Sequence, residues 1–363
     1  MPTRRSVRIA AVALAALVAC GSDGDSPAHS TTLPLPPPVS IRRPDTSAAW
    51  RRITNDSANR LANTVRLPRR QQSDSISLVA AIRDGLRHPG WPVSGPAPLP
   101  GAILPGHRIV AFYGNPLSAR MGILGELAPD RMLARLDSLV VQWRAADPGT
   151  AVLPALHLIS VVAQAKPGRD KLYRLRMDSA LIQRVYGWAR RKQAILILDI
   201  QAGRSAIHQE LPRLLPWLAL PDVHLALDPE FYMHYNREGL APGARIGALD
   251  AADVNYAIEQ LAGLVTRHHL PPKVLIIHRF TRNMLQNSAK IRLDPRVQVV
   301  INMDGWGQPW LKYDSYATCE VAEPVQFTGF KLFFHNDTQK GDLLLTPPEV
   351  LVLRPRPMYI QYQ

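Results

Sequence analysis

The sequence predicts an α/β protein whose folded part is a (β/α)8 barrel that follows a Pro-rich tether. Eight short apolar runs rich in Val, Ile and Leu recur after residue 106. Their mean spacing of about 34 residues suits a strand followed by a helix. Most runs are apolar on both faces, as parallel strands covered by helices are. Eight such units in about 255 residues match the size of a (β/α)8 barrel. An open doubly wound sheet is the alternative architecture.

Each predicted strand is an apolar run closed by polar residues. The strands are expected at 109–113, 152–157, 194–199, 223–228, 273–278, 297–304 and 329–335, with the last one within 350–362. Apolar residues at helical spacing predict helices at 130–146, 179–192, 206–218 and 250–269. Pro212 and Pro216 interrupt the third helix, and Asp250 is the expected N-cap of the fourth. The later helices are poorly indicated: 280–291 is short, a helix at 313–323 is doubtful, and 338–348 has little room for one.

The first 19 residues have the layout of a secretory signal peptide. Three arginines precede an apolar, uncharged stretch at 9–19. The sequence LVACGS at 17–22 resembles the lipobox of bacterial lipoproteins, in which the cysteine is acylated and becomes the N-terminus. This resemblance implies a lipid on Cys20 that attaches an exported chain to a membrane of the bacterial cell envelope. A plain secretory signal remains the alternative.

The segment 20–105 is predicted to be a tether, and the folded domain is predicted to span 106–363. Pro, Ser, Thr and Asp are frequent in the tether, and this composition favours an extended chain. Only the segment 77–88 has a helical pattern there.

Charge and cysteine content exclude several classes of protein. Lys and Arg outnumber Asp and Glu by 43 to 29, but the excess is spread along the chain, so a nucleic-acid partner is not expected. Such a charge suits an anionic membrane or an acidic envelope polymer. Two cysteines cannot form a disulfide framework.

Polar residues stand at the ends of the predicted strands. In a (β/α)8 barrel the C-terminal strand ends and the loops after them form the functional site. Burying a ring of ionisable groups there costs free energy unless the groups form ion pairs, so such a ring indicates a functional site. The strand ends supply Tyr113, His157, Asp199, Gln201, Asp228, Glu230, His278, Arg279, Asp304, His335 and Asp337.

The sequence LALDPEF at 225–231 carries the most specific motif of the ring. The strand pleat places Asp228 and Glu230 on one side, where their like charges raise one pKa and produce a general acid. The pair resembles the fourth-strand Asp-x-Glu of chitinase-like and muramidase-like barrel glycosidases. In those enzymes the glutamate protonates the leaving oxygen, and the aspartate supports it or positions the acetamido group of the substrate. The longer chitinase-type pattern has a further aspartate where this chain has Ala226.

Taken together, the lipobox and glycosidase resemblances imply an envelope-anchored glycosidase that acts on a cell-envelope or environmental glycan. Glu230 would be the acid and Asp228 its partner, and one further carboxylate would be the base or nucleophile. The candidates for this last role are Asp199, Asp304 and Asp337. Substrate binding is assigned to Trp306, since aromatic rings suit the faces of pyranose sugars, and to further residues of the strand ends. These are Tyr113, His157, Gln201, His278, Arg279 and His335.

Two other functions remain open, so the sequence does not decide whether the protein is an enzyme. One is a metal-dependent hydrolase in which His157, His278 and His335 join aspartates around a divalent ion. The chain has no His-x-His or His-Glu-x-x-His motif, so no residue is assigned as a metal ligand and no cofactor is expected. The other is a barrel that binds a glycan without cleaving it.

Overall fold

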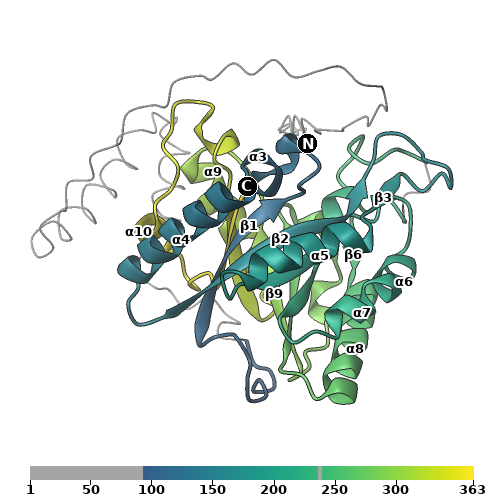
Figure 1. The fold of residues 1–363 in the computed structure, drawn as a ribbon, viewed down its shortest axis with the longest axis horizontal. Coiled ribbons are helices and arrows are strands. Elements are labelled where there is room, and N and C mark those ends of the chain that lie inside the picture. Colours follow the sequence, from purple (N-terminus) through teal and green to yellow (C-terminus); the bar gives the residue numbers. More distant parts are fainter. Residues whose placement is uncertain (1–92, 236–238) are drawn as a thin grey trace, which may run out of the picture. The chain divides into compact units, whose positions relative to one another are not determined.

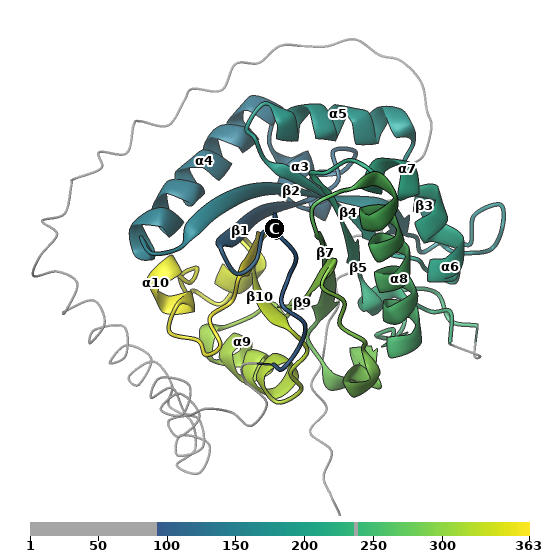
Figure 2. The ribbon, with the colours of Figure 1, turned by 90° about the horizontal axis from the view of Figure 1, so that it is seen from below.

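Eight parallel strands form a closed barrel in the computed structural model, which describes residues 93–235 and 239–363. They are β1 (His107–Gly114), β2 (Ala151–Ala163), β4 (Ile195–Ile200), β5 (Val223–Leu227), β7 (Lys273–Arg279), β9 (Val297–Met303), β10 (Phe327–Leu332) and β11 (Tyr359–Tyr362). Neighbouring strands pair in the order β1-β11-β10-β9-β7-β5-β4-β2, and β1 also pairs with β2, so the ring is complete (Figures 1 and 2). The predicted (β/α)8 barrel is confirmed, and the open sheet is not formed.

The interior of the barrel is mostly apolar at the end where the strands begin, with Gln298 as a buried exception, and polar at the end where they finish. Alternate residues of a barrel strand point inward. Ile109, Ala111, Ala155, Ile195, Ile197, Ala226, Val274, Ile276, Val300 and Tyr359 pack together as one buried cluster with Leu104. The strand ends continue these inward rows with polar residues. Gly329 lies within this interior, where a Cβ atom would come 2.6 Å from Asn302 Oδ1 and 3.0 Å from the Tyr359 ring.

The helices of the first half match the prediction, as Figure 2 shows around the outside of the barrel. They are α4 (Pro129–Ala146), α5 (Ser179–Arg190), α6 (Ile207–Glu210), α7 (Leu215–Leu218) and α8 (Ala251–His268). A 3-10 turn, η2 (Leu211–Arg213), separates α6 from α7, because the prolines divide this segment. Asp250 caps α8, and its side chain accepts a hydrogen bond of 2.9 Å from Ala252 N.

Short elements complete the connections. Before α4 lie η1 (Ala119–Met121) and α3 (Ile123–Glu126); β3 (Arg174–Arg176) pairs antiparallel with β2, and η3 (Pro229–Phe231) follows β5. Between β7 and β9 lie η4 (Arg282–Met284), β8 (Leu285–Gln286), which pairs with β6 (Leu249–Asp250), and η5 (Ser288–Lys290). After β9, α9 (Pro309–Ser315) continues into a π-helix, η6 (Tyr316–Val321). After β10 come η7 (Asn336–Thr338) and α10 (Pro347–Val350). After β7 and β10 only short helical turns occur, but the doubtful helix at 313–323 is partly formed, since α9 and η6 make one continuous helical stretch over 309–321.

The packed structure includes residues just before the predicted start at 106. Leu104 is buried at the N-terminal end of the barrel, where its N–H donates to Gln298 Oε1 (3.0 Å) and its carbonyl accepts from Gln298 Nε2 (2.6 Å). The predicted leader, Cys20 and the helix at 77–88 lie outside the described residues. Within 93–235 and 239–363, no helix has the length and apolarity needed to cross a membrane. Cys319 is a buried free cysteine.

Candidate functional site

Polar side chains from several strands meet at the C-terminal end of the barrel, which we call the mouth. Asp199, at the end of β4, lies at their centre and is fully buried. Its Oδ2 accepts a hydrogen bond of 3.3 Å from the Tyr113 hydroxyl. The same oxygen lies 3.5 Å from His157 Nε2 and 3.7 Å from His278 Nε2. The predicted convergence of these strand ends is therefore observed.

Asp304 pairs with Lys331 and His278 on one side of the mouth. Its Oδ1 lies 2.7 Å from Lys331 Nζ, and its Oδ2 lies 2.8 Å from His278 Nδ1. Burial alone would raise the pKa of Asp304, but Lys331 and His278 lower it to about 2. Burial opposes the charge of His278, yet Asp304 and Asp199 raise its pKa. Asp304 is therefore ionised at neutral pH, with Lys331 as its counter-ion.

Asp228 and Glu230 form the other side of the mouth. Asp228 Oδ2 accepts from Gln201 Nε2 (3.0 Å), and Asp228 Oδ1 accepts from the backbone N–H of Glu230 (3.0 Å). Gln201 Nε2 also donates to the Tyr113 hydroxyl at 3.2 Å. Glu230 is a partly exposed residue, and its carboxyl group makes no hydrogen bond or ion pair within residues 93–235 and 239–363.

The two carboxyl groups of this pair resist ionisation. Burial is the main cause, and nearby carboxylates add to it. The pKa of Asp228 rises to about 7, since Asp199 and Asp304 add to burial while His278 opposes it. The pKa of Glu230 rises to about 8, with Asp228 and Asp304 adding to burial. Near pH 7 the mouth therefore holds two ionised carboxylates, Asp199 and Asp304, and two carboxyl groups that keep much of their protons.

His157 is held from behind by residues of β11. Its Nδ1 lies 2.7 Å from the Tyr359 hydroxyl and 2.9 Å from Gln361 Nε2. Asn302 Nδ2 donates to Gln361 Oε1 at 3.3 Å and extends this network to β9. Burial lowers the pKa of His157 to about 4, so its imidazole ring is neutral at pH 7.

Arg279, His335 and Asp337 are not joined to this group by any hydrogen bond or ion pair among the described residues. Arg279 follows His278, so the pleat turns it to the opposite side of β7, where Nη1 donates to Cys319 O (3.0 Å) and an ion pair forms with Glu323. His335 is exposed, and its Nε2 lies 3.0 Å from Glu126 Oε2.

Asp337 stabilises a loop beside the mouth. Its carboxylate accepts hydrogen bonds from Gly307 N and Phe333 N, both 2.9 Å long, and lies 3.0 Å from Lys312 Nζ. This arrangement fixes the loop that carries Trp306, whose side chain is 39% exposed.

Sequence reasoning missed four polar residues of the mouth: Lys331, Asn302, Tyr359 and Gln361. The prediction ended the seventh strand at His335, whereas β10 ends at Leu332, so Lys331 is its last inward residue. The sequence contained a signal for Asn302. It stands two positions before Asp304, and side chains two positions apart in a strand point to the same face.

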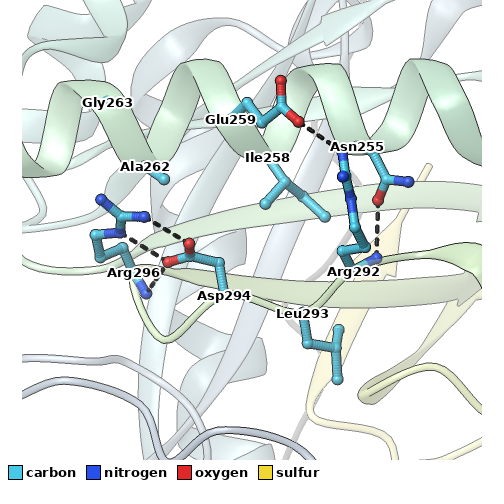
Figure 3. Close-up of a pocket in the computed structure, with 9 residues that line it drawn as sticks. All are labelled: Asn255, Ile258, Glu259, Ala262, Gly263, Arg292, Leu293, Asp294 and Arg296. Carbon is cyan, nitrogen blue, oxygen red and sulfur yellow. Dashed lines mark hydrogen bonds and ion pairs between the residues drawn. The ribbon is translucent and has the colours of Figure 1, made fainter.

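A second hollow lies outside the barrel, between α8 and residues 292–296 (Figure 3). Its charged groups neutralise one another. Arg292 Nη2 lies 2.6 Å from Glu259 Oε1, and Arg296 Nη2 lies 2.6 Å from Asp294 Oδ2. With its charges paired, this hollow is a less suitable place for chemistry than the mouth.

Comparisons with known proteins give no family assignment. No family model matches the chain, and the comparison with curated proteins found no match. Among solved structures, the chain is similar to Plasmodium falciparum HPPK-DHPS in its complex with pteroate, with a TM-score of 0.25 and 10% sequence identity. The similarity covers 62% of this chain and 44% of that chain, so this chain spans less than half of that protein's length. The barrel assignment rests on the strand pairing described above.

Proposed function

We propose that the protein hydrolyses a glycan, with Glu230 as the proton donor to the leaving oxygen and Asp228 as its partner. The observation that carries this proposal is the placement of Glu230. Glu230 is a partly exposed residue at the mouth whose carboxyl group has no partner among the described residues, while Asp228 beside it is fixed by Gln201 and by the Glu230 N–H. A general acid needs this combination of access to substrate and freedom from competing hydrogen bonds.

The charges of the mouth support the role of Glu230. A general acid must hold its proton at the working pH, and the ideal pKa lies near that pH. Asp228 and Asp304 raise the pKa of Glu230 in addition to burial, which brings it to about 8. If Glu230 is the acid, activity falls on the alkaline side near that pH.

The other carboxylates are poorly placed to attack a sugar. Asp199 is fully buried beside two histidines, Asp304 is paired with Lys331 and His278, and Asp337 is paired with Lys312. This favours a substrate-assisted reaction, in which an acetamido group of the sugar attacks and Asp228 orients it. The proposed substrate class is therefore a glycan that contains N-acetylhexosamine.

We further propose that the protein acts in the bacterial cell envelope, attached by a lipid on Cys20. The signal-like leader and lipobox-like sequence support this location. An envelope location would bring the mouth to amino-sugar polymers. The exposed rings of Trp306 and Trp310 offer flat surfaces for sugars beside α9.

The test uses aryl glycosides of N-acetylhexosamine oligomers with poor and good leaving groups. Glu230→Gln should lower kcat/KM by about 10²- to 10⁴-fold for a poor leaving group. The loss should be far smaller for a good one, because that leaving group departs without a proton. Glu259→Gln on the outside of α8 is the matched control and should keep wild-type rates.

Two results would contradict the proposal. If Glu230→Gln lowers kcat/KM equally for poor and good leaving groups, Glu230 is not the general acid. If the wild-type protein cleaves no N-acetylhexosamine substrate, the proposed substrate class is wrong.

A further inference from the structure

Three buried side chains beneath the Asp228–Glu230 pair carry polar atoms with no hydrogen-bond partner among the described residues. These atoms are His157 Nε2, Asp199 Oδ1 and both ring nitrogens of His278, of which Nδ1 lies within ion-pair distance of Asp304. All three side chains are fully buried and come from three different strands, β2, β7 and β4. Buried polar atoms are almost always satisfied, so a group of unsatisfied ones in one place calls for a common partner.

The spacing of these groups suits a shared cation better than direct hydrogen bonds. The two Nε2 atoms lie 3.5 and 3.7 Å from Asp199 Oδ2, beyond the usual range of about 2.7–3.2 Å for N–H···O bonds. Ligand atoms each about 2.1 Å from a tetrahedral zinc ion lie about 3.4 Å apart. One ligand atom from each of the three residues lies within 4.8 Å of the other two.

The outer contacts of both histidines have the pattern that supports metal ligands. A histidine that binds a metal through one ring nitrogen is usually oriented by an oxygen at the other. Asp304 Oδ2 lies 2.8 Å from His278 Nδ1, and the Tyr359 hydroxyl lies 2.7 Å from His157 Nδ1. The Gln361 amide at 2.9 Å can present its oxygen to the same nitrogen by rotating. Both Nε2 atoms are thereby directed towards Asp199.

We propose that His157, Asp199 and His278 bind one divalent ion of the zinc class. Two imidazoles and one carboxylate form a donor set that suits Zn²⁺ and neighbouring first-row ions. This inference does not depend on glycan hydrolysis. A bound ion would lie below Glu230, where it could polarise a substrate oxygen or a water molecule.

The experiment titrates the chelator-treated full chain with Zn²⁺ by calorimetry and with Co²⁺ by visible absorption. We expect one ion per chain and cobalt d–d bands typical of a low-symmetry nitrogen and oxygen site. Asp199→Asn should weaken Zn²⁺ binding by at least about 100-fold, since it removes the anionic ligand. Tyr359→Phe should weaken binding by about 10-fold or more, since outer contacts typically contribute 10- to 100-fold. His335→Ala removes an exposed histidine and should bind as the wild type does.

The wild-type titration decides the question even if a variant fails to fold. Absence of a one-to-one complex at micromolar Zn²⁺ would overturn the proposal. Binding that persists unchanged in Asp199→Asn, or that disappears in His335→Ala, would place the ion on surface histidines and overturn it as well. Glu230→Gln should retain full Zn²⁺ affinity. The Zn²⁺ titration therefore tests the metal site independently of the glycoside assay, which tests the proposed hydrolysis.

Discussion

Glu230→Gln should make the protein more stable in alkaline solution, whatever its effect on catalysis. The Glu230 carboxyl group has a pKa of about 8 in the folded protein, against an ordinary value of 4.5. At a pH between these values the unfolded chain has released this proton while the folded protein keeps it. The contribution of this group to stability is therefore present below pH 4.5 and is lost as the pH rises through 8. Glutamine has nearly the same shape and no proton to lose.

The size of the effect follows from the pKa difference. Each pH unit in this window changes the free energy of unfolding by at most about 1.4 kcal/mol per group, so the full shift corresponds to about 4 kcal/mol between pH 5 and pH 8. Glu230 is partly exposed and shares its electrostatic field with Asp228. We therefore expect the stability of Glu230→Gln relative to wild type to rise by roughly 1–3 kcal/mol over this range.

Urea denaturation at pH 5, 6.5 and 8, with a chelator present, measures this difference. Glu259→Gln removes a carboxylate that is paired with Arg292 on the surface, so its effect should be small at every pH. A constant difference between Glu230→Gln and wild type from pH 5 to pH 8 would refute the reasoning. It would show that Glu230 has an ordinary pKa and is ionised in the folded protein.

Three further substitutions test stability. Lys312→Met should lower the free energy of unfolding by about 3–5 kcal/mol, because it leaves Asp337 buried without its cation; a loss below about 1 kcal/mol by urea denaturation would contradict this. Gly122→Ala should cost at least about 2 kcal/mol, because Gly122 has φ of +120° and a Cβ atom would lie 2.5 Å from Tyr113 O. Gly187→Ala in α5 meets no neighbour within 4 Å, so it should raise the stability by about 0.5–1 kcal/mol, and equal effects of the two changes would be contrary to expectation.

The barrel could be predicted because each strand carries its own signal. Runs such as 195–198 and 274–277 are apolar on both faces, and a buried parallel strand needs this. The helices α4 and α8 were predictable from their apolar spacing and, for α8, from the Asp250 cap. The connections after the later strands have no such repeat, so the π-helix η6 and the β6–β8 pair could not be foreseen.

Only those residues of the site that stand at the ends of apolar strands could be predicted from the sequence. Asp199, Asp228 and His278 were predicted because each stands where a buried strand finishes. Which side chains pair could not be predicted, since pairing depends on distances between side chains of different strands. Lys331 is an example, because its partner Asp304 belongs to the loop after the neighbouring strand.

The closure of the ring has a consequence for the order of folding. Strand β11 is four residues long and pairs on both sides, with β1 and with β10. Its contact with β1 joins Ile109 to Tyr359, and contacts between such distant residues form slowly. Until 359–362 are available, β1 and β10 both present unpaired edges, which are sites for aggregation. Synthesis therefore cannot yield a closed barrel before residues 359–362 have been made, and the β1 and β10 edges need protection until that point.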